Sequence, residues 1–141
     1  MTFEARIPVR FGDEDHAGIV YFPRYLHYCH CAFEDFFAAS GRTYREVLDE
    51  DKCGWPSVHL ETEFLKPLRF GDELLIDVWV SRIGTKSATF SYRGHRAGEV
   101  GDIMRCKITV VCVDFDDLTS KPIPEFYRAL FERHQQPPEG A

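Results

Sequence analysis

Residues 11–25 read Phe-Gly-Asp-Glu-Asp-His-Ala-Gly-Ile-Val-Tyr-Phe-Pro-Arg-Tyr, and the rest of the chain is organised around this stretch. It opens with three consecutive carboxylates, Asp13, Glu14 and Asp15, and continues through a glycine that allows a tight turn. Its second half is too apolar for an ordinary surface loop, so we expect the loop to be partly buried. Proline has no N–H and a fixed φ, which suits the first position of a helix, so Pro23 predicts a helix start.

The predicted helix start places free backbone N–H groups close to the acidic loop. Such groups can stabilise a developing negative charge, and a nearby carboxylate can attack a carbonyl or accept a proton. The stretch therefore suits acyl chemistry. The alternative is that Asp13 and Asp15 are loop carboxylates that bond to their own backbone, as most Asp residues in turns do.

The helix itself is predicted from Pro23 to Ser40. Apolar residues recur through this segment at helical spacing, and Gly41 is well placed to follow the last turn. The apolar stripe is wide and aromatic, with Phe33 and Phe37 in its second half. We therefore expect something larger than one neighbouring helix to enclose it.

The segments outside this helix mostly have the pattern of strands. Period-2 alternation or β-branched enrichment marks residues 3–10, 58–64, 73–82, 87–95 and 102–115. Most of them are joined by short turns, which implies antiparallel neighbours. Residues 42–56 are expected to form a short helical turn and a loop, and residues 125–134 a short closing helix before a Pro/Gly tail from about residue 136.

These elements predict the α+β class and a single domain over residues 1–141. A five-stranded antiparallel sheet has one face to cover and one long helix to cover it, so we expect the sheet to be wrapped around one long central helix. The chain is long enough to bury one core, and nothing in its composition predicts a second domain.

Charge and hydropathy narrow the possible partners. The net charge of −6 argues against nucleic acid, because phosphate binding needs a cationic face. The start of the chain has an acid, Glu4, where a signal peptide would have its basic region, and no apolar stretch approaches membrane-spanning length. We expect a cytoplasmic protein with no membrane partner.

Five cysteines form an odd number, and four of them lie inside apolar patterns, so we expect reduced thiols and no disulfides. His27, Cys29, His30 and Cys31 crowd together in a way that suggests a metal site. However, Cys29 and Cys31 lie about 200° apart around a helix, so the four side chains cannot converge on one ion. We predict no metal and no other cofactor.

Four motifs point to one family. The first reads Asp13-Glu-Asp15-His-Ala-Gly18-Ile-Val-Tyr21, and the others are Leu-Lys-Pro-Leu-Arg-Phe-Gly-Asp at 65–72, Val-Cys-Val-Asp-Phe at 111–115 and Lys-Pro-Ile-Pro at 121–124. The sequence resembles the 4-hydroxybenzoyl-CoA thioesterase family of hotdog-fold acyl-CoA thioesterases, whose N-terminal pattern is Asp-x-Asp-x-x-Gly-Val-Val-Tyr before a long helix. The resemblance covers almost the whole chain, with all four motifs in the family's order.

The resemblance implies a set of site residues. The family's catalytic acid is the second of the pair, which is Asp15 here, acting as nucleophile or general base. The carbonyl-binding donor is the backbone N–H of Phe22, and Gly18 gives the loop its geometry. On the substrate side we expect Tyr21, Leu26 and His30, where the family often carries an acid in place of His30. The resemblance also implies a homodimer or a dimer-of-dimers tetramer with the active site between subunits.

A second cluster is a candidate for binding the CoA phosphates. Arg82, Thr85, Lys86 and Ser87 gather at one predicted hairpin, where cations and hydroxyls can pair with phosphate. The alternative is an exposed hairpin with solvated charges.

The predicted function is hydrolysis of an acyl-CoA to the free acid and CoA. Aromatic residues on the helix and His30 at the margin of its apolar stripe favour an aromatic or short-chain acyl group, such as 4-hydroxybenzoyl-CoA. One alternative is a hotdog-fold dehydratase, which would need a loop histidine and a helical acid, for example His16 with Glu34. The other is a non-catalytic acyl-CoA binding protein.

Overall fold

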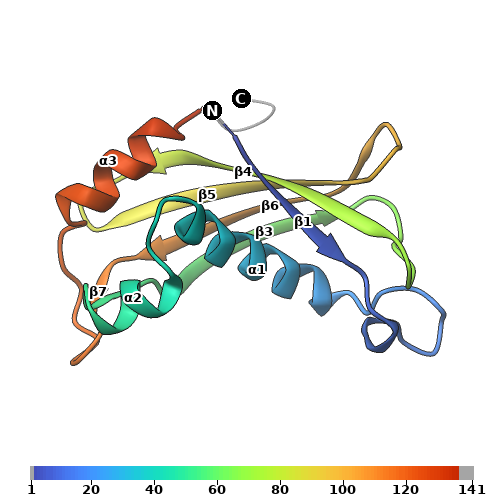
Figure 1. Ribbon diagram of the computed structural model, residues 1–141, viewed down its shortest axis with the longest axis horizontal. Helices are drawn as coiled ribbons and strands as arrows, with labels where there is room; N and C mark the ends of the chain where they lie inside the picture. Colours follow the sequence, from blue (N-terminus) through green and yellow to red (C-terminus); the bar gives the residue numbers. More distant parts are fainter. Residues whose placement is uncertain (1, 137–141) are drawn as a thin grey trace.

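The computed structural model describes residues 2–136 of the chain (Figure 1). Its main sheet has five antiparallel strands in the order β1-β4-β5-β6-β3. These strands are β1 (Phe3–Pro8), β3 (Ser57–Phe64), β4 (Glu73–Ile83), β5 (Ser87–Arg96) and β6 (Asp102–Val111). The predictions of the α+β class and of a five-stranded antiparallel sheet are confirmed. The Pro/Gly tail predicted from about residue 136 lies, beyond Gln136, outside the described residues.

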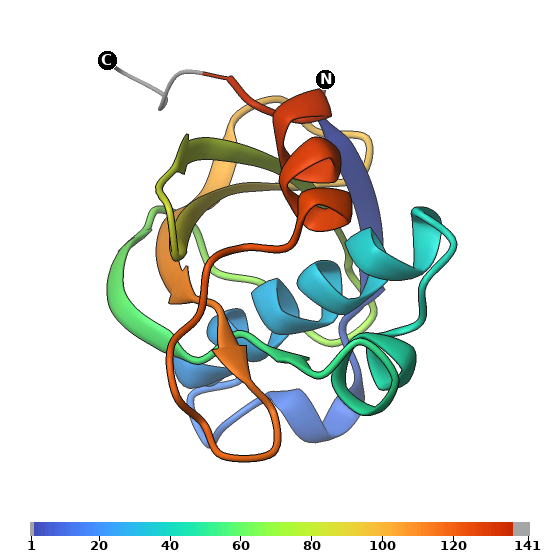
Figure 2. The same ribbon diagram turned by 90° about the vertical axis from the view of Figure 1, so that its left-hand side faces the viewer.

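The sheet curls around helix α1 (Pro23–Ala39), which crosses Figure 2 obliquely inside the curve of the strands. The start at Pro23 and the end before Gly41 follow from the proline and glycine signals, and Gly41 has a φ of 97°, in the left-handed region that glycine tolerates. The wide aromatic stripe of the helix is buried: Phe33 and Phe36 pack edge-to-face on Phe90 of β5, with ring centroids 5.0 and 5.6 Å apart.

A second helix lies where the sequence predicts a short closing helix over residues 125–134, so the prediction of one long central helix is not confirmed. Helix α3 (Glu125–Arg133) also has more than two turns, and it buries Tyr127, Leu130 and Phe131. Phe131 lies edge-to-face on Phe90, with centroids 5.1 Å apart. The aromatic core therefore extends past α1, and α3 closes the end of the sheet that α1 leaves open.

The segments at 42–56 and 102–115 also differ from the prediction. Residues 42–56 contain α2 (Tyr44–Asp49) and the short strand β2 (Cys53–Gly54), and the expected long strand breaks after Val111, so that β7 (Val113–Asp114) pairs with β2. A Cβ at Gly54 would lie 2.9 Å from a methyl carbon of Val113, so the close approach requires glycine. This contact joins two segments that are distant in the sequence, and no periodic pattern in the sequence predicts it.

Strand β3 is the outer strand on one side of the sheet, and most of it is exposed on both faces. Val58, Leu60 and Phe64 are 60%, 40% and 45% exposed, although all three are apolar. Exposed apolar edge strands are templates for pairing with another strand. In the part of the chain that the structure describes, no helix is both long and apolar enough to cross a bilayer.

Candidate active site

The acidic loop folds back on itself as a short antiparallel ladder. The Asp15 N–H donates to the Ile19 carbonyl at 3.0 Å, and the Tyr21 N–H donates to the Asp13 carbonyl at 2.9 Å. Gly18 lies in the tip with a φ of 79°, so its role in the structure is conformational. The ladder holds the carboxylates beside the N-terminus of α1, at the right-hand end of Figure 1.

Asp13 anchors this loop to the helix. Its Oδ2 accepts hydrogen bonds from the Tyr28 hydroxyl at 2.7 Å and from the Arg10 N–H at 3.0 Å. Burial raises the pKa of Asp13, but the Tyr28 hydroxyl, the Arg10 N–H and the charge of Arg24 together hold that pKa below its ordinary value of 3.8. Asp13 is therefore an ionised structural group.

The next two carboxylates have different surroundings. Glu14 accepts from the Phe70 N–H at 2.8 Å and so ties the loop to the β3–β4 connection. Asp15 is exposed, and its Oδ1 accepts from the Ala17 N–H at 2.8 Å. A hydrogen bond to the loop's own backbone is what the alternative to catalysis predicts, but this one occupies only one of the two carboxylate oxygens. Oδ2 of Asp15 has no hydrogen-bond partner within residues 2–136.

The N-terminus of α1 is uncapped. The backbone of Phe22 is already helical, with φ −53° and ψ −35°, and no side chain caps the helix. The Phe22 N–H donates to no acceptor within the described residues. The Phe22 ring lies on Phe64 at the end of β3, with centroids 6.1 Å apart, so this helix start borders the exposed edge of the sheet.

A small cavity of about 150 Å³ lies between α1 and strands β3, β5 and β6. It is lined by Leu26, His30, Phe33, Trp55, Ser57, Leu60, Tyr92, Ile108 and Val110. The structure thus brings together two predicted substrate residues, Leu26 and His30, whereas Tyr21 lies exposed beside the helix start. The half-exposed His30 bonds through Nε2 to Glu34 at 2.7 Å, one turn further along α1.

The predicted CoA hairpin lies at the opposite end of the sheet from the acidic loop (Figure 1). Gly84 N–H bonds to the Ser87 carbonyl at 2.7 Å, which closes the turn between β4 and β5. Lys86 is exposed and its ammonium lies 3.5 Å from the Ser120 hydroxyl. Within one chain, the structure does not bring Arg82, Thr85, Lys86 or Ser87 to Asp15.

The pair required by the dehydratase alternative is not assembled within the chain. His16 is exposed in the acidic loop, whereas Glu34 lies twelve residues beyond Phe22, roughly 18 Å along the helix. The Glu34 carboxylate is instead bonded to His30. No group of three potential metal ligands among His, Cys, Asp and Glu converges within residues 2–136, and all five cysteines are free.

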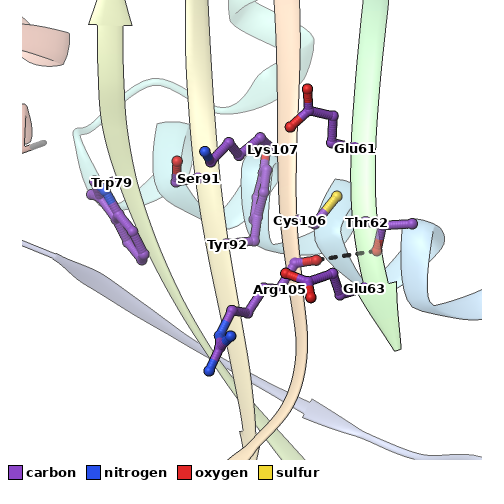
Figure 3. A pocket seen from close by; sticks show the side chains of 9 residues that line it. All are labelled: Glu61, Thr62, Glu63, Trp79, Ser91, Tyr92, Arg105, Cys106 and Lys107. Atoms are coloured by element: carbon purple, nitrogen blue, oxygen red, sulfur yellow. Dashed lines mark hydrogen bonds between the residues drawn. The ribbon is translucent and has the colours of Figure 1, made fainter. Parts of the chain in front are cut away.

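Another cavity, of about 480 Å³, lies on the outer face of the sheet and contains none of the predicted site residues (Figure 3). Trp79, Ser91, Lys107 and Glu61 form one row of Cα partners across β4, β5, β6 and β3. The adjacent row, on the face toward α1, contains Tyr92 and Cys106. Both residues also line the outer cavity, and Tyr92 lines the small cavity beside α1 as well, so the two cavities lie on opposite sides of the sheet with Tyr92 between them.

Two polar contacts of the candidate site were not predicted from the sequence. Glu34 was named only as the helical acid of the dehydratase alternative, but its contact with His30 could have been predicted, because it stands four residues after His30 and such pairs meet on one helix face. Ser120 near Lys86 depends on a contact between segments 34 residues apart, for which the sequence contains no local signal.

Comparison with known proteins gives a consistent result. A family model described as the thioesterase-like superfamily matches residues 9–131. A 1,4-dihydroxy-2-naphthoyl-CoA hydrolase from Nostoc punctiforme is 30% identical over 141 residues, covering 100% of this chain and 94% of the relative.

Solved structures agree with the fold. A gentisyl-coenzyme A thioesterase has a TM-score of 0.80 and 30% identity, with 89% of this chain and 99% of that chain covered. An Asp-to-Asn mutant of 4-hydroxybenzoyl-CoA thioesterase in complex with 4-hydroxybenzoyl-CoA has a TM-score of 0.83 and 25% identity, with 92% and 98% covered.

Proposed function

The chain belongs to the thioesterase-like superfamily and is a thioester hydrolase, and we propose that it hydrolyses an aromatic acyl-CoA at the acidic loop and the N-terminus of α1. One observation carries this proposal. The Oδ2 of Asp15 and the N–H of Phe22 belong to the same loop–helix junction, and neither has a partner within residues 2–136. An unused carboxylate oxygen and an unused N–H donor are the two groups that acyl hydrolysis needs.

In the proposed mechanism the thioester carbonyl oxygen accepts a hydrogen bond from the Phe22 N–H. This bond strengthens as negative charge develops on the oxygen, so it stabilises the transition state more than the substrate. Asp15 either attacks the carbonyl carbon, forming an anhydride that water then hydrolyses, or removes a proton from an attacking water. In both routes the carbon–sulfur bond breaks and the CoA thiolate leaves.

We place the complete site between two copies of the chain. Within the described residues β3 pairs with β6 on one side, and its other side carries no partner strand. A two-fold axis perpendicular to the sheet would pair this strand antiparallel with the same strand of a second copy. The pairing would cover the exposed Val58 and Leu60 in the interface, and a homodimer is the smallest assembly that achieves it.

This arrangement explains why the CoA hairpin and the acidic loop are far apart in one chain. The two-fold axis reverses the strand direction of the second copy. Its β4–β5 turn therefore lies at the same end as the acidic loop of the first copy, and the partner subunit's Lys86 can face the phosphates of a CoA whose thioester lies at Asp15. A homodimer then has two equivalent sites.

The acyl group we propose is an aromatic ring with a hydroxyl substituent. A cavity of about 150 Å³ beside α1 is near the size that accommodates a single aromatic ring. Glu34 can only accept when ionised, so it favours a proton on Nε2 of His30, which leaves Nδ1 of a neutral imidazole free to accept. A ring hydroxyl can donate to that nitrogen. The names of the relatives, which refer to dihydroxynaphthoyl, gentisyl and hydroxybenzoyl thioesters, support this class.

A panel of thioesters tests this substrate class. We expect kcat/KM, measured as CoA release, to be higher for 4-hydroxybenzoyl-CoA than for benzoyl-CoA, and lowest for palmitoyl-CoA. His30→Ala should reduce the preference for the hydroxylated ring about tenfold, because one hydrogen bond to the substrate is lost. His27→Ala, on the same helix but outside the cavity lining, is the matched control and should leave the ranking unchanged.

Two results would contradict the substrate proposal. Palmitoyl-CoA could be the best substrate, or the ranking could be identical in wild type and His30→Ala. Absence of CoA release from every thioester would instead contradict hydrolysis itself and favour the binding-protein alternative.

A further inference from the structure

We propose that Arg128 of α3 is a positioning residue for CoA: it holds the β4–β5 turn in the form that presents Lys86 to the phosphates. The inference rests on the proposed function of this turn. Arg128 does not belong to any motif described above, and it acts through the backbone of the turn rather than through contact with the reacting atoms.

The contact is made by one guanidinium nitrogen. Nη2 of Arg128 donates to the Gly84 carbonyl at 2.8 Å and to the Thr85 carbonyl at 3.1 Å. Two successive carbonyls of the turn therefore point to the same cation on α3. A hydrogen bond from a charged donor is stronger than one from a neutral donor, so these contacts contribute substantially to the shape of a four-residue turn.

The other hydrogen bonds to the carbonyls of this turn come from the segments that precede α3. The Ile123 N–H donates to the Thr85 carbonyl at 3.0 Å, and the Cys112 N–H donates to the Lys86 carbonyl at 2.7 Å. All three carbonyls from Gly84 to Lys86 are therefore bonded to segment 112–128. In contrast, the N–H groups of Thr85 and Lys86 donate to no acceptor in the described part of the chain.

The turn is also sterically tight. A Cβ at Gly84 would lie 2.9 Å from the Ser87 hydroxyl oxygen and 3.4 Å from the Ser87 carbonyl oxygen, so a larger residue there requires the Ser87 side chain to turn away. The contacts from Arg128, Ile123 and Cys112 hold the carbonyls of this turn on its inner side. Loss of Arg128 removes the only contact to the Gly84 carbonyl that the structure shows among the described residues.

The charge of Arg128 adds to this effect. Neither Arg128 nor Lys86 forms an ion pair with a carboxylate within residues 2–136, so two uncompensated cations lie at one turn. Bonded carbonyls on the inside, free N–H groups and an exposed ammonium make up a surface suited to phosphate. Because Arg128 is bonded to the inner side of the turn, we assign the contact with CoA to Lys86 and the positioning to Arg128.

The test compares two substrates that share an acyl group and differ in the nucleotide. We expect Arg128→Met to raise KM for 4-hydroxybenzoyl-CoA roughly fivefold to tenfold, with kcat changed less than about twofold. KM for 4-hydroxybenzoyl-pantetheine, which has no phosphates, should be unchanged. The effect on the CoA thioester should shrink as salt rises. Arg128→Lys, which keeps the charge and one donor, should recover part of the loss.

Arg133→Met, on the same helix and exposed, is the matched control and should change neither KM.

A further variant, Lys86→Ala, distinguishes the positioning role of Arg128 from the phosphate site itself. If Lys86→Ala raises KM for the CoA thioester and Arg128→Met does not, the positioning role is wrong and the phosphate site stands. If neither variant changes KM, the turn does not bind phosphate and both proposals about it fail. Equal rises in KM for the CoA and pantetheine thioesters in Arg128→Met would show a merely structural role and overturn the inference.

Discussion

Asp15→Asn is expected to lower kcat for acyl-CoA hydrolysis by roughly 10²-fold or more, with the fold intact. The amide oxygen of asparagine can still accept the Ala17 N–H that now bonds to Oδ1, so the loop conformation should persist. The negative charge that attacks the carbonyl or activates water is lost. Steady-state kinetics of CoA release, together with an unchanged Tm, would measure this effect.

The matched control is Asp13→Asn, two residues away. Both hydrogen bonds to this side chain converge on one oxygen, Oδ2, so an amide oxygen placed there can keep them while the charge is lost. We expect a small change in kcat and a lower Tm at neutral pH. The folded-state pKa of Asp13 is below its ordinary value, so its charge stabilises the fold above about pH 3.8 and loses that effect as pH falls through the folded pKa. Equal losses of kcat in both variants would contradict the assignment of Asp15.

The second large effect is expected from Phe22→Pro, which removes the backbone N–H proposed to bind the thioester oxygen. Loss of one such donor lowers kcat by about 10²- to 10³-fold in well-characterised acyl hydrolases. The φ of −53° at this position is within the range that proline adopts, so the substitution is compatible with the local backbone angle. The measurement is kcat for 4-hydroxybenzoyl-CoA, with the circular dichroism spectrum as the check on folding.

Phe22→Ala provides the comparison, because it removes the ring and keeps the N–H. The ring is 61% exposed and contacts Phe64, so its loss should have a modest effect on KM and on stability. If the alanine variant loses as much kcat as the proline variant, the ring and not the N–H is the functional group.

Local signals in the sequence were sufficient to predict the main helix and the sheet. Pro23 and Gly41 mark the two ends of α1 because each has a backbone preference that acts within its own few residues. Alternation and short turns similarly predict antiparallel strands. The β2–β7 pair was missed because it depends on the contact of Gly54 with Val113, and that contact exists only after the chain has folded.

The candidate site likewise combines features that local sequence signals predict with features that only the folded chain shows. The resemblance singles out Asp15 over Asp13, but the physical difference between these two neighbours comes from Tyr28, which reaches Asp13 from the helix 15 residues away. The sequence likewise identifies the cationic hairpin at 82–87, but it does not show where this hairpin lies relative to the acidic loop. Strand order determines that the two lie at opposite ends of one chain, and strand order is a tertiary property.

Subunit complementation tests most directly whether the active site is shared between two chains. An Asp15→Asn chain and a Lys86→Glu chain, carrying different affinity tags, are coexpressed, and the heterodimer is purified. Its kcat/KM for 4-hydroxybenzoyl-CoA is measured at substrate concentrations well below KM.

In a shared site, Asp15 of one chain works with the partner subunit's Lys86, so the heterodimer contains one intact site and one doubly altered site. The account predicts that it recovers about half of the wild-type kcat/KM, because one of two symmetric sites is restored. A heterodimer with no more than half the activity of the Lys86→Glu homodimer would contradict it, because each site would then consist of one chain alone.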